Sequence, residues 1–120
     1  ALYERNLISN TIVSTSVLIK VLTLRCFKDN NFEITPEQFV ILNAIATNTT
    51  MYQRQLGKLI GKDRANITRL LKILENKKLI EKEESSNGRQ IFKISLTKKG
   101  KELQTKILPV ILKTRETYLK

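Results

Sequence analysis

The chain of 120 residues contains no histidine and only one cysteine, Cys26. Without histidine, an enzyme lacks the imidazole that most often serves as a general base, and Cys26 has no evident partner to activate it as a nucleophile. A lone cysteine excludes an intramolecular disulfide framework and is typical of a reducing cytoplasm. The sequence contains no cluster of histidine, cysteine or acidic residues at the spacing of metal ligands. We therefore expect neither a metal site nor a cofactor.

Long apolar runs and catalytic signatures are also missing. The apolar stretch near the N-terminus is interrupted by Ser, Thr, Asn and Lys, and no segment reaches the roughly 18 apolar residues that a membrane span needs. No signal peptide is recognisable. The sequence has neither a phosphate-binding glycine loop nor paired carboxylates in a plausible cleft. We therefore expect a cytoplasmic protein that is not an enzyme and does not contact a membrane.

Acidic residues are scarce, and the positive charge is concentrated in one region. The chain has 22 Lys and Arg against 11 Asp and Glu, and residues 53–101 alone hold 14 against 5. Such clustering favours a polyanionic partner such as nucleic acid. The alternative is that the charge serves only solubility.

Residues 2–28 are rich in apolar side chains that recur at helical spacing on more than one face. A helix that is apolar this widely is buried on two sides, usually by a second chain. We expect residues 1–34 to form a long dimerisation helix and a connector. The alternative is a helix buried wholly within one subunit.

A second helix is predicted to begin after Thr35. Thr35 can cap it, Pro36 suits the first helical position, and Gln38 completes a capping box. The helix is expected to end before residues 47–50, because Thr and Asn compete for backbone hydrogen bonds.

A helix-turn-helix pattern follows. A short helix over residues 52–60 is expected to turn Leu56, Leu59 and Ile60 inward, and Gly61 is placed for a left-handed C-cap. Asp63 can then cap a second helix over about 64–77. The turn between the two helices has the length of a helix-turn-helix.

The second helix divides into two faces when each residue advances 100°. Its core face is formed by Ile67, Leu70, Leu71 and Leu74. The outward residues are basic, polar or small, which are the types that read bases and phosphates in a major groove. The candidate DNA-binding residues on this helix are Arg64, Ala65, Asn66, Thr68, Arg69 and Lys72. The alternative is an ordinary solvated helix face.

A two-stranded hairpin is predicted over residues 79–83 and 90–96. Asn87 and Gly88 supply the positive φ angles of a type I′ turn. Arg89 stands beside that turn, where it can enter a minor groove as part of a wing. The alternative is that Arg89 pairs with Glu83 or Glu84.

The last segment, residues 97–120, is expected to be a helix capped by Thr97. Pro109 is expected to kink or interrupt it. Its apolar stripe is assigned to the same dimer interface as the first helix, because a domain this small leaves it little to pack on. The stripe consists of Leu103, Ile107, Val110, Ile111 and Leu119.

Together these segments predict a mainly α-helical fold with a small β-hairpin wing: a winged helix-turn-helix domain (35–96) between N- and C-terminal dimerisation helices. The stretches TPEQFVIL and QLGKLIGKDRANITRLLKILENKKLIEKEESSNGRQIFKISLTKKGKEL resemble the MarR family of bacterial winged-helix transcriptional regulators. Two positions depart from the family pattern. Asn87 stands where the wing commonly has an acidic residue, and Tyr52 where the first motif helix often has a Ser or Thr cap.

The resemblance implies a homodimer that binds double-stranded DNA at a pseudo-palindromic promoter site, usually as a repressor. It implies that Arg64, Asn66, Thr68 and Arg69 lie in the DNA-reading turn and that Arg89 is the wing arginine. It also implies release by a signal, either a small aromatic effector or oxidation, for which Cys26 is the candidate thiol. The alternative for Cys26 is a buried small apolar side chain that senses nothing. The rival hypotheses are a winged-helix protein-interaction module, an RNA binder and a non-specific architectural nucleic-acid binder.

Overall fold

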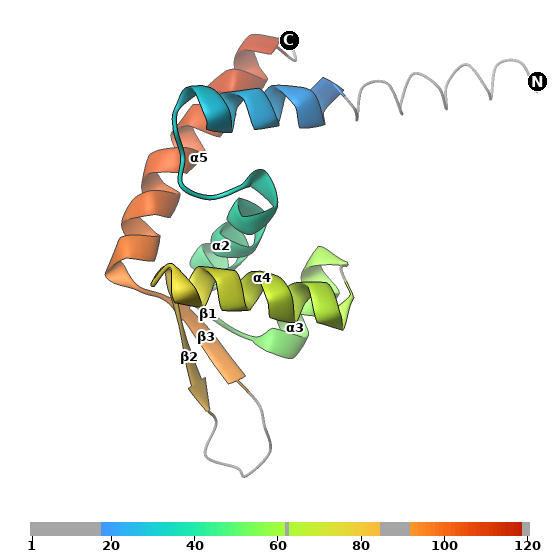
Figure 1. Ribbon diagram of the computed structural model, residues 1–120, viewed down its shortest axis with the longest axis vertical. Coiled ribbons are helices and arrows are strands. Elements are labelled where there is room, and N and C mark those ends of the chain that lie inside the picture. Colours follow the sequence, from blue (N-terminus) through green and yellow to red (C-terminus); the bar gives the residue numbers. More distant parts are fainter. Residues whose placement is uncertain (1–17, 62, 85–91, 119–120) are drawn as a thin grey trace, which may run out of the picture.

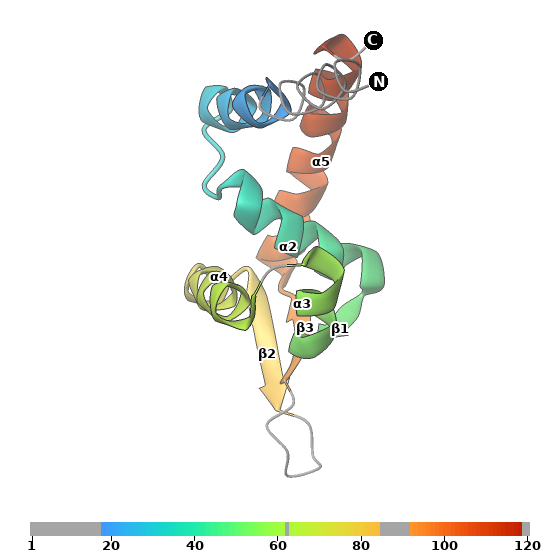
Figure 2. The same ribbon diagram turned by 90° about the vertical axis from the view of Figure 1, so that its right-hand side faces the viewer.

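The computed structural model describes residues 18–61, 63–84 and 92–118, and the elements in these ranges form a small sheet covered by helices. A helix over residues 18–29 is followed by α2 (Pro36–Asn48), β1 (Thr50–Tyr52), α3 (Gln53–Ile60), α4 (Arg64–Asn76), β2 (Ile80–Glu84), β3 (Phe92–Leu96) and α5 (Lys98–Tyr118). The antiparallel sheet has the order β1-β3-β2. Figure 1 and Figure 2 show α2, α3 and α4 gathered beside the sheet, with helix 18–29 and the far end of α5 at the opposite end of the molecule. The predicted winged helix-turn-helix architecture is confirmed.

The start of α2 is confirmed as predicted. Thr35 Oγ1 accepts a hydrogen bond from the backbone N–H of Gln38, and Gln38 Oε1 accepts one from the N–H of Thr35. The predicted end is wrong, because the helix runs on through Asn48. Thr47 and Asn48 donate their side-chain hydrogen bonds to carbonyl oxygens one turn earlier, at 2.9 and 2.8 Å, so their polar groups do not disrupt the helix.

The sheet contains a third strand, β1, where the sequence predicted only a two-stranded hairpin. Thr49 adopts a positive φ of 65° and ends α2. Met51 then pairs with Ile94 in β3, and both side chains are buried. Two predictions for the hairpin, the type I′ turn at Asn87 and Gly88 and the position of Arg89, lie outside the described residues.

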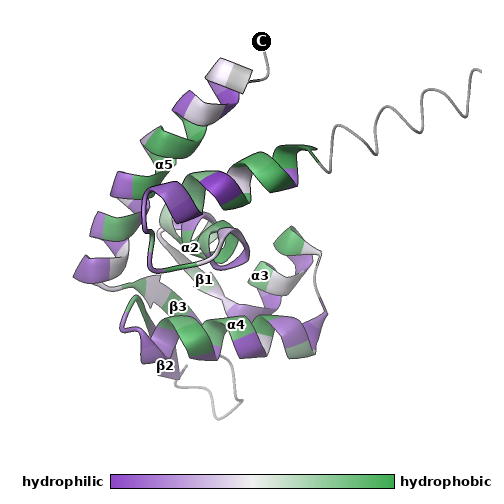
Figure 3. Ribbon diagram, turned by 45° about the horizontal axis from the view of Figure 1, so that its top comes forward, coloured by the Kyte–Doolittle hydropathy of each residue, from purple (hydrophilic) through white to green (hydrophobic). Residues whose placement is uncertain are grey.

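The core lies between α2, α4 and the sheet. The predicted inward face of α4 is confirmed, since Ile67, Leu70, Leu71 and Leu74 are all at most 1% exposed. In Figure 3 the ribbon of α4 alternates between hydrophobic and hydrophilic residues, as expected of a helix with one buried face. The inward orientation predicted for Leu59 is wrong, because its side chain is 61% exposed. Leu56 and, in part, Ile60 fill the contact with the core instead.

Helix α5 begins at its predicted cap, where Thr97 Oγ1 accepts a hydrogen bond from the N–H of Gly100 at 3.0 Å. Pro109 does not interrupt the helix. The proline ring removes one backbone N–H donor from the helix. The Pro109 side chain is exposed, so solvent reaches the helix at this position. Leu103 and Ile107 belong to the core of the single subunit, which corrects their assignment to a dimer interface. None of the helices formed by the described residues is long and apolar enough to cross a bilayer.

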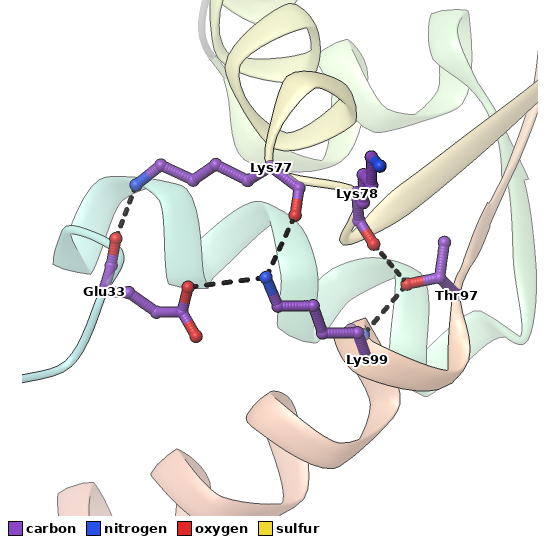
Figure 4. Close-up of polar contacts among 6 residues, drawn as sticks. Glu33, Lys77, Lys78, Thr97 and Lys99 are labelled. Carbon is purple, nitrogen blue, oxygen red and sulfur yellow. Dashed lines mark hydrogen bonds and ion pairs between the residues drawn. The ribbon is translucent and has the colours of Figure 1, made fainter.

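Hydrogen bonds and an ion pair link three segments: the residues just before α2, the end of α4 and the start of α5. Lys77 Nζ donates to the carbonyl oxygen of Glu33, and Lys99 Nζ lies 3.7 Å from Glu33 Oε2 and 3.4 Å from the carbonyl oxygen of Lys77 (Figure 4). Thr97 Oγ1 donates to the carbonyl oxygen of Lys78 at 2.7 Å. We call these five residues the joint.

Candidate nucleic-acid interface

The turn between α3 and α4 has the geometry of a helix-turn-helix. Gly61 ends α3 in the left-handed conformation, with φ 72° and ψ 18°, and its N–H donates to the carbonyl oxygen of Gly57. Asp63 then caps α4, its Oδ1 accepting the N–H of Asn66 at 2.8 Å. Both predicted caps are confirmed, and together they fix where α4 begins relative to α3.

The outward face of α4 presents the predicted candidate residues to solvent. Arg64, Ala65, Thr68, Arg69 and Lys72 are exposed, and Asn66 is half-buried. The helix carries no acidic residue before its last two positions. This face is therefore positively charged and open along the N-terminal half of the helix, as a surface that contacts a polyanion should be. Arg89, the seventh candidate, lies outside the part of the chain that the structure describes.

Hydrogen bonds line up three side chains along this face. Asn66 Nδ2 donates to Asp63 Oδ2 at 3.3 Å, and Arg69 Nη2 donates to Asn66 Oδ1 at 3.5 Å. Asp63 thus both caps the helix and holds the Asn66 amide, and that amide directs one edge of the Arg69 guanidinium. Because a guanidinium has five N–H donors in a rigid fork, Arg69 keeps most of them for a ligand.

Sequence reasoning missed one residue of this surface, Gln53, the first residue of α3. Its Nε2 donates to Thr68 Oγ1 at 3.1 Å, and Thr68 in turn donates to the carbonyl oxygen of Arg64 at 2.8 Å. The available signal was the position of Gln53 at the N-terminus of the first motif helix, next to the unusual cap Tyr52. Tyr52 is indeed the N-cap residue, and its N–H donates to Gln55 Oε1 at 3.1 Å.

A second surface of interest lies on helix 18–29 and the distal part of α5. Leu18, Val21, Leu24 and Leu112 are 45–58% exposed, which is high for large apolar side chains. Cys26 is buried instead, and its Sγ lies 3.5 Å from Thr114 Oγ1 of α5. A small cavity of about 20 Å³ between these two helices is lined by Ile19, Leu22, Thr23, Cys26, Ile111, Thr114 and Arg115.

Several solved structures share this fold. AbsC, a MarR family transcriptional regulator from Streptomyces coelicolor, aligns with a TM-score of 0.86 at 17% identity, over 95% of this chain and 78% of that one. A mutant MarR from Escherichia coli in complex with operator DNA aligns with a TM-score of 0.79 at 20% identity, over 90% and 76%. Reduced AbfR bound to DNA aligns with a TM-score of 0.80 at 20% identity, over 93% and 77%.

The sequence itself also matches known regulators. The transcriptional repressor MprA of Escherichia coli is 36% identical over 62 residues, which are 52% of this chain and 35% of that repressor. The match therefore spans about a third of the length of MprA. A family model described as MarR family matches residues 32–91, which include α2, β1, α3, α4 and β2. Because that match covers half of the sequence and the fold agrees with it, the chain belongs to the MarR family.

Proposed function

We propose that this protein is a sequence-specific DNA-binding transcriptional repressor and not an enzyme. The observation that carries the proposal is the outward face of α4, where basic, polar and small side chains stand exposed on a helix that is capped by Asp63 and packs against α3. Support also comes from the family, in which MprA is a repressor and MarR and AbfR have been solved with DNA.

In this proposal the N-terminal half of α4 lies in the major groove. Arg69 is placed to donate two hydrogen bonds to a guanine, the commonest specific contact of an arginine. Ala65 allows close approach and can touch a thymine methyl, while Arg64 and Lys72 neutralise phosphates. Arg89 in the wing supplies the contact to the adjacent minor groove.

We further propose that the protein acts as a homodimer through helix 18–29 and the distal part of α5. The exposed side chains of Leu18, Val21, Leu24 and Leu112 support this, because covering apolar surface is the main driving force of association. A two-fold dimer presents two copies of α4, so its site should be pseudo-palindromic, with half-sites about one helical turn apart.

Release from DNA is proposed to follow binding of a small aromatic effector. The cavity of about 20 Å³ beside Cys26 is far below the roughly 300 Å³ that ligand sites occupy. An effector there has to part helix 18–29 from α5. A second, open depression on the surface is lined by Asn48, Met51, Gln55, Lys58 and Leu59, and Lys58 there offers a charge to an aromatic carboxylate. Oxidation of Cys26 is the less favoured signal because the thiol is buried.

Fluorescence anisotropy tests the proposal. Duplex DNA from the region upstream of the protein's own gene is titrated at several salt concentrations, with a random duplex of equal length as the control. We expect a preference of about a thousandfold or more for the upstream duplex. Equal and strongly salt-dependent binding to both duplexes indicates a non-specific architectural binder. No binding by a folded dimer indicates a protein-interaction module.

A further inference from the structure

We propose that Gln53, together with the backbone carbonyl of Arg64, fixes the hydrogen-bonding polarity of Thr68, so that Thr68 reads an adenine or a cytosine through its exocyclic amino group. Gln53 is then a positioning residue on α3 for a base-reading residue on α4. The inference rests on the proposed function, because it assigns one specific contact within the proposed DNA interface.

Thr68 already makes two hydrogen bonds within the protein. A hydroxyl has one proton to donate and two lone pairs that accept. Thr68 Oγ1 donates its proton to the carbonyl oxygen of Arg64 at 2.8 Å. The group that faces Thr68 Oγ1 at 3.1 Å must therefore be a donor, which assigns the NH₂ rather than the oxygen of the Gln53 amide to that position.

These two bonds use the proton and one lone pair of Thr68 Oγ1, so one lone pair remains to accept a further hydrogen bond. The exposed hydroxyl can accept a hydrogen bond from DNA but can no longer donate one. In the major groove the donors are the amino groups of adenine N6 and cytosine N4, whereas guanine O6 and N7 and thymine O4 only accept. Phosphate oxygens also only accept. The Thr68 hydroxyl is thereby excluded as a donor to phosphate, and its hydrogen bonds to bases are restricted to the amino-bearing ones.

Gln53 is well placed to hold this arrangement. It is half-buried at the first position of α3, and α3 is fixed against α4 by the caps at Gly61 and Asp63. The β-branched Thr68 side chain has few χ1 rotamers in a helix, so its hydroxyl direction is already restricted. If Gln53 were absent, the hydroxyl could leave the Arg64 carbonyl and donate to guanine or thymine.

The test is selection of bound sequences from a random duplex library, with the wild type, Gln53→Leu, Thr68→Val and the double variant. We expect the wild type to prefer adenine or cytosine at one position of each half-site by about fivefold, the discrimination that one such hydrogen bond supplies. Each of the three variants should lower that preference to about twofold or less at this same position. Thr68→Ser, which keeps the hydroxyl, should retain it.

Gln55→Leu is the matched control, since it makes the same change two residues later and removes only the bond to the Tyr52 N–H. It should leave the preferred sequence unchanged. Circular dichroism verifies that each variant is folded. Two results for folded Gln53→Leu overturn the inference: an unchanged base preference at every position, or a preference weakened equally at all positions. Neither result contradicts the proposed DNA binding. A wild type that selects no sequence overturns both the inference and the proposed function.

Discussion

Lys77, the C-cap residue of α4, donates a hydrogen bond from its ammonium to the backbone carbonyl of Glu33, in the connector that follows helix 18–29 (Figure 4). The two residues are 44 positions apart in the sequence. Lys99 of α5 reaches the same place from the other side. The end of the proposed recognition helix is thereby tied to the two segments that carry the proposed dimer surface.

Replacing Lys77 with Met removes this tie, and we expect the free energy of unfolding to fall by about 1 kcal/mol. The magnitude is that of a hydrogen bond to a charged group that is still partly solvated. Urea denaturation measures the loss. Lys101→Met, at an exposed position of α5, is the control and should cost less than about 0.5 kcal/mol. Equal losses in the two variants contradict a stabilising role of the joint.

Gly100 is required by the close approach of α5 to the residues that follow α4. A Cβ atom added at Gly100 lies 2.0 Å from the carbonyl oxygen of Leu79, and that oxygen already accepts the N–H of Thr97. We expect Gly100→Ala to destabilise the protein by about 3 kcal/mol. At Gly57 in α3 an added Cβ meets nothing within 4 Å, so Gly57→Ala should stabilise it by about 0.5–1 kcal/mol. Thermal unfolding distinguishes the opposite signs.

Asp63 connects helix stability to the proposed DNA surface. Asp63→Ala removes the N-cap of α4 and should cost about 1 kcal/mol, whereas Asp63→Asn keeps a capping oxygen and should cost far less. Chemical denaturation of both variants checks this difference. If the two variants lose the same stability, the negative charge rather than the cap is responsible.

Burial of Cys26 predicts low reactivity. Its side chain is 7% exposed, and Sγ lies near the hydroxyl group of Thr114 and the amide group of Asn30. A thiol reagent should therefore label Cys26 slowly in the native protein and rapidly in denaturant. Likewise, Cys26→Ser should leave any effect of peroxide on DNA binding unchanged. Rapid native labelling together with loss of a peroxide response in Cys26→Ser would instead identify a redox sensor.

The predictable parts of the fold are those set by local sequence. The capping box of Thr35 and Gln38, the left-handed Gly61 and the cap of Asp63 each depend on residues within one turn, and all are confirmed. The third strand was not predicted, because Met51 pairs with Ile94 far along the chain and its three-residue segment shows no periodicity of its own.

The proposed DNA-binding surface could also be predicted only in the parts that depend on local sequence. The exposed face of α4 follows from helical periodicity, so its residues could be chosen from the sequence. For Gln53 the sequence offered only its position at the start of α3, because its hydrogen bond to Thr68 depends on how α3 crosses α4. Leu59 and Ile60 were both predicted to turn inward because both are apolar, but the packing of α3 leaves Leu59 exposed and only Ile60 against the core.

The outward face of α4 is proposed to read base sequence, and Arg69 is the residue of that face with the strongest expected base contact. The measurement is the ratio of affinities for the upstream duplex and a random duplex, for the wild type, Arg69→Ala and Lys106→Ala. Lys106 is an exposed cation on α5, so its removal changes the net charge equally. Arg69→Ala should lower the ratio by about tenfold or more, while Lys106→Ala leaves it unchanged. An unchanged ratio in Arg69→Ala, with both affinities reduced alike, would contradict base reading by this residue.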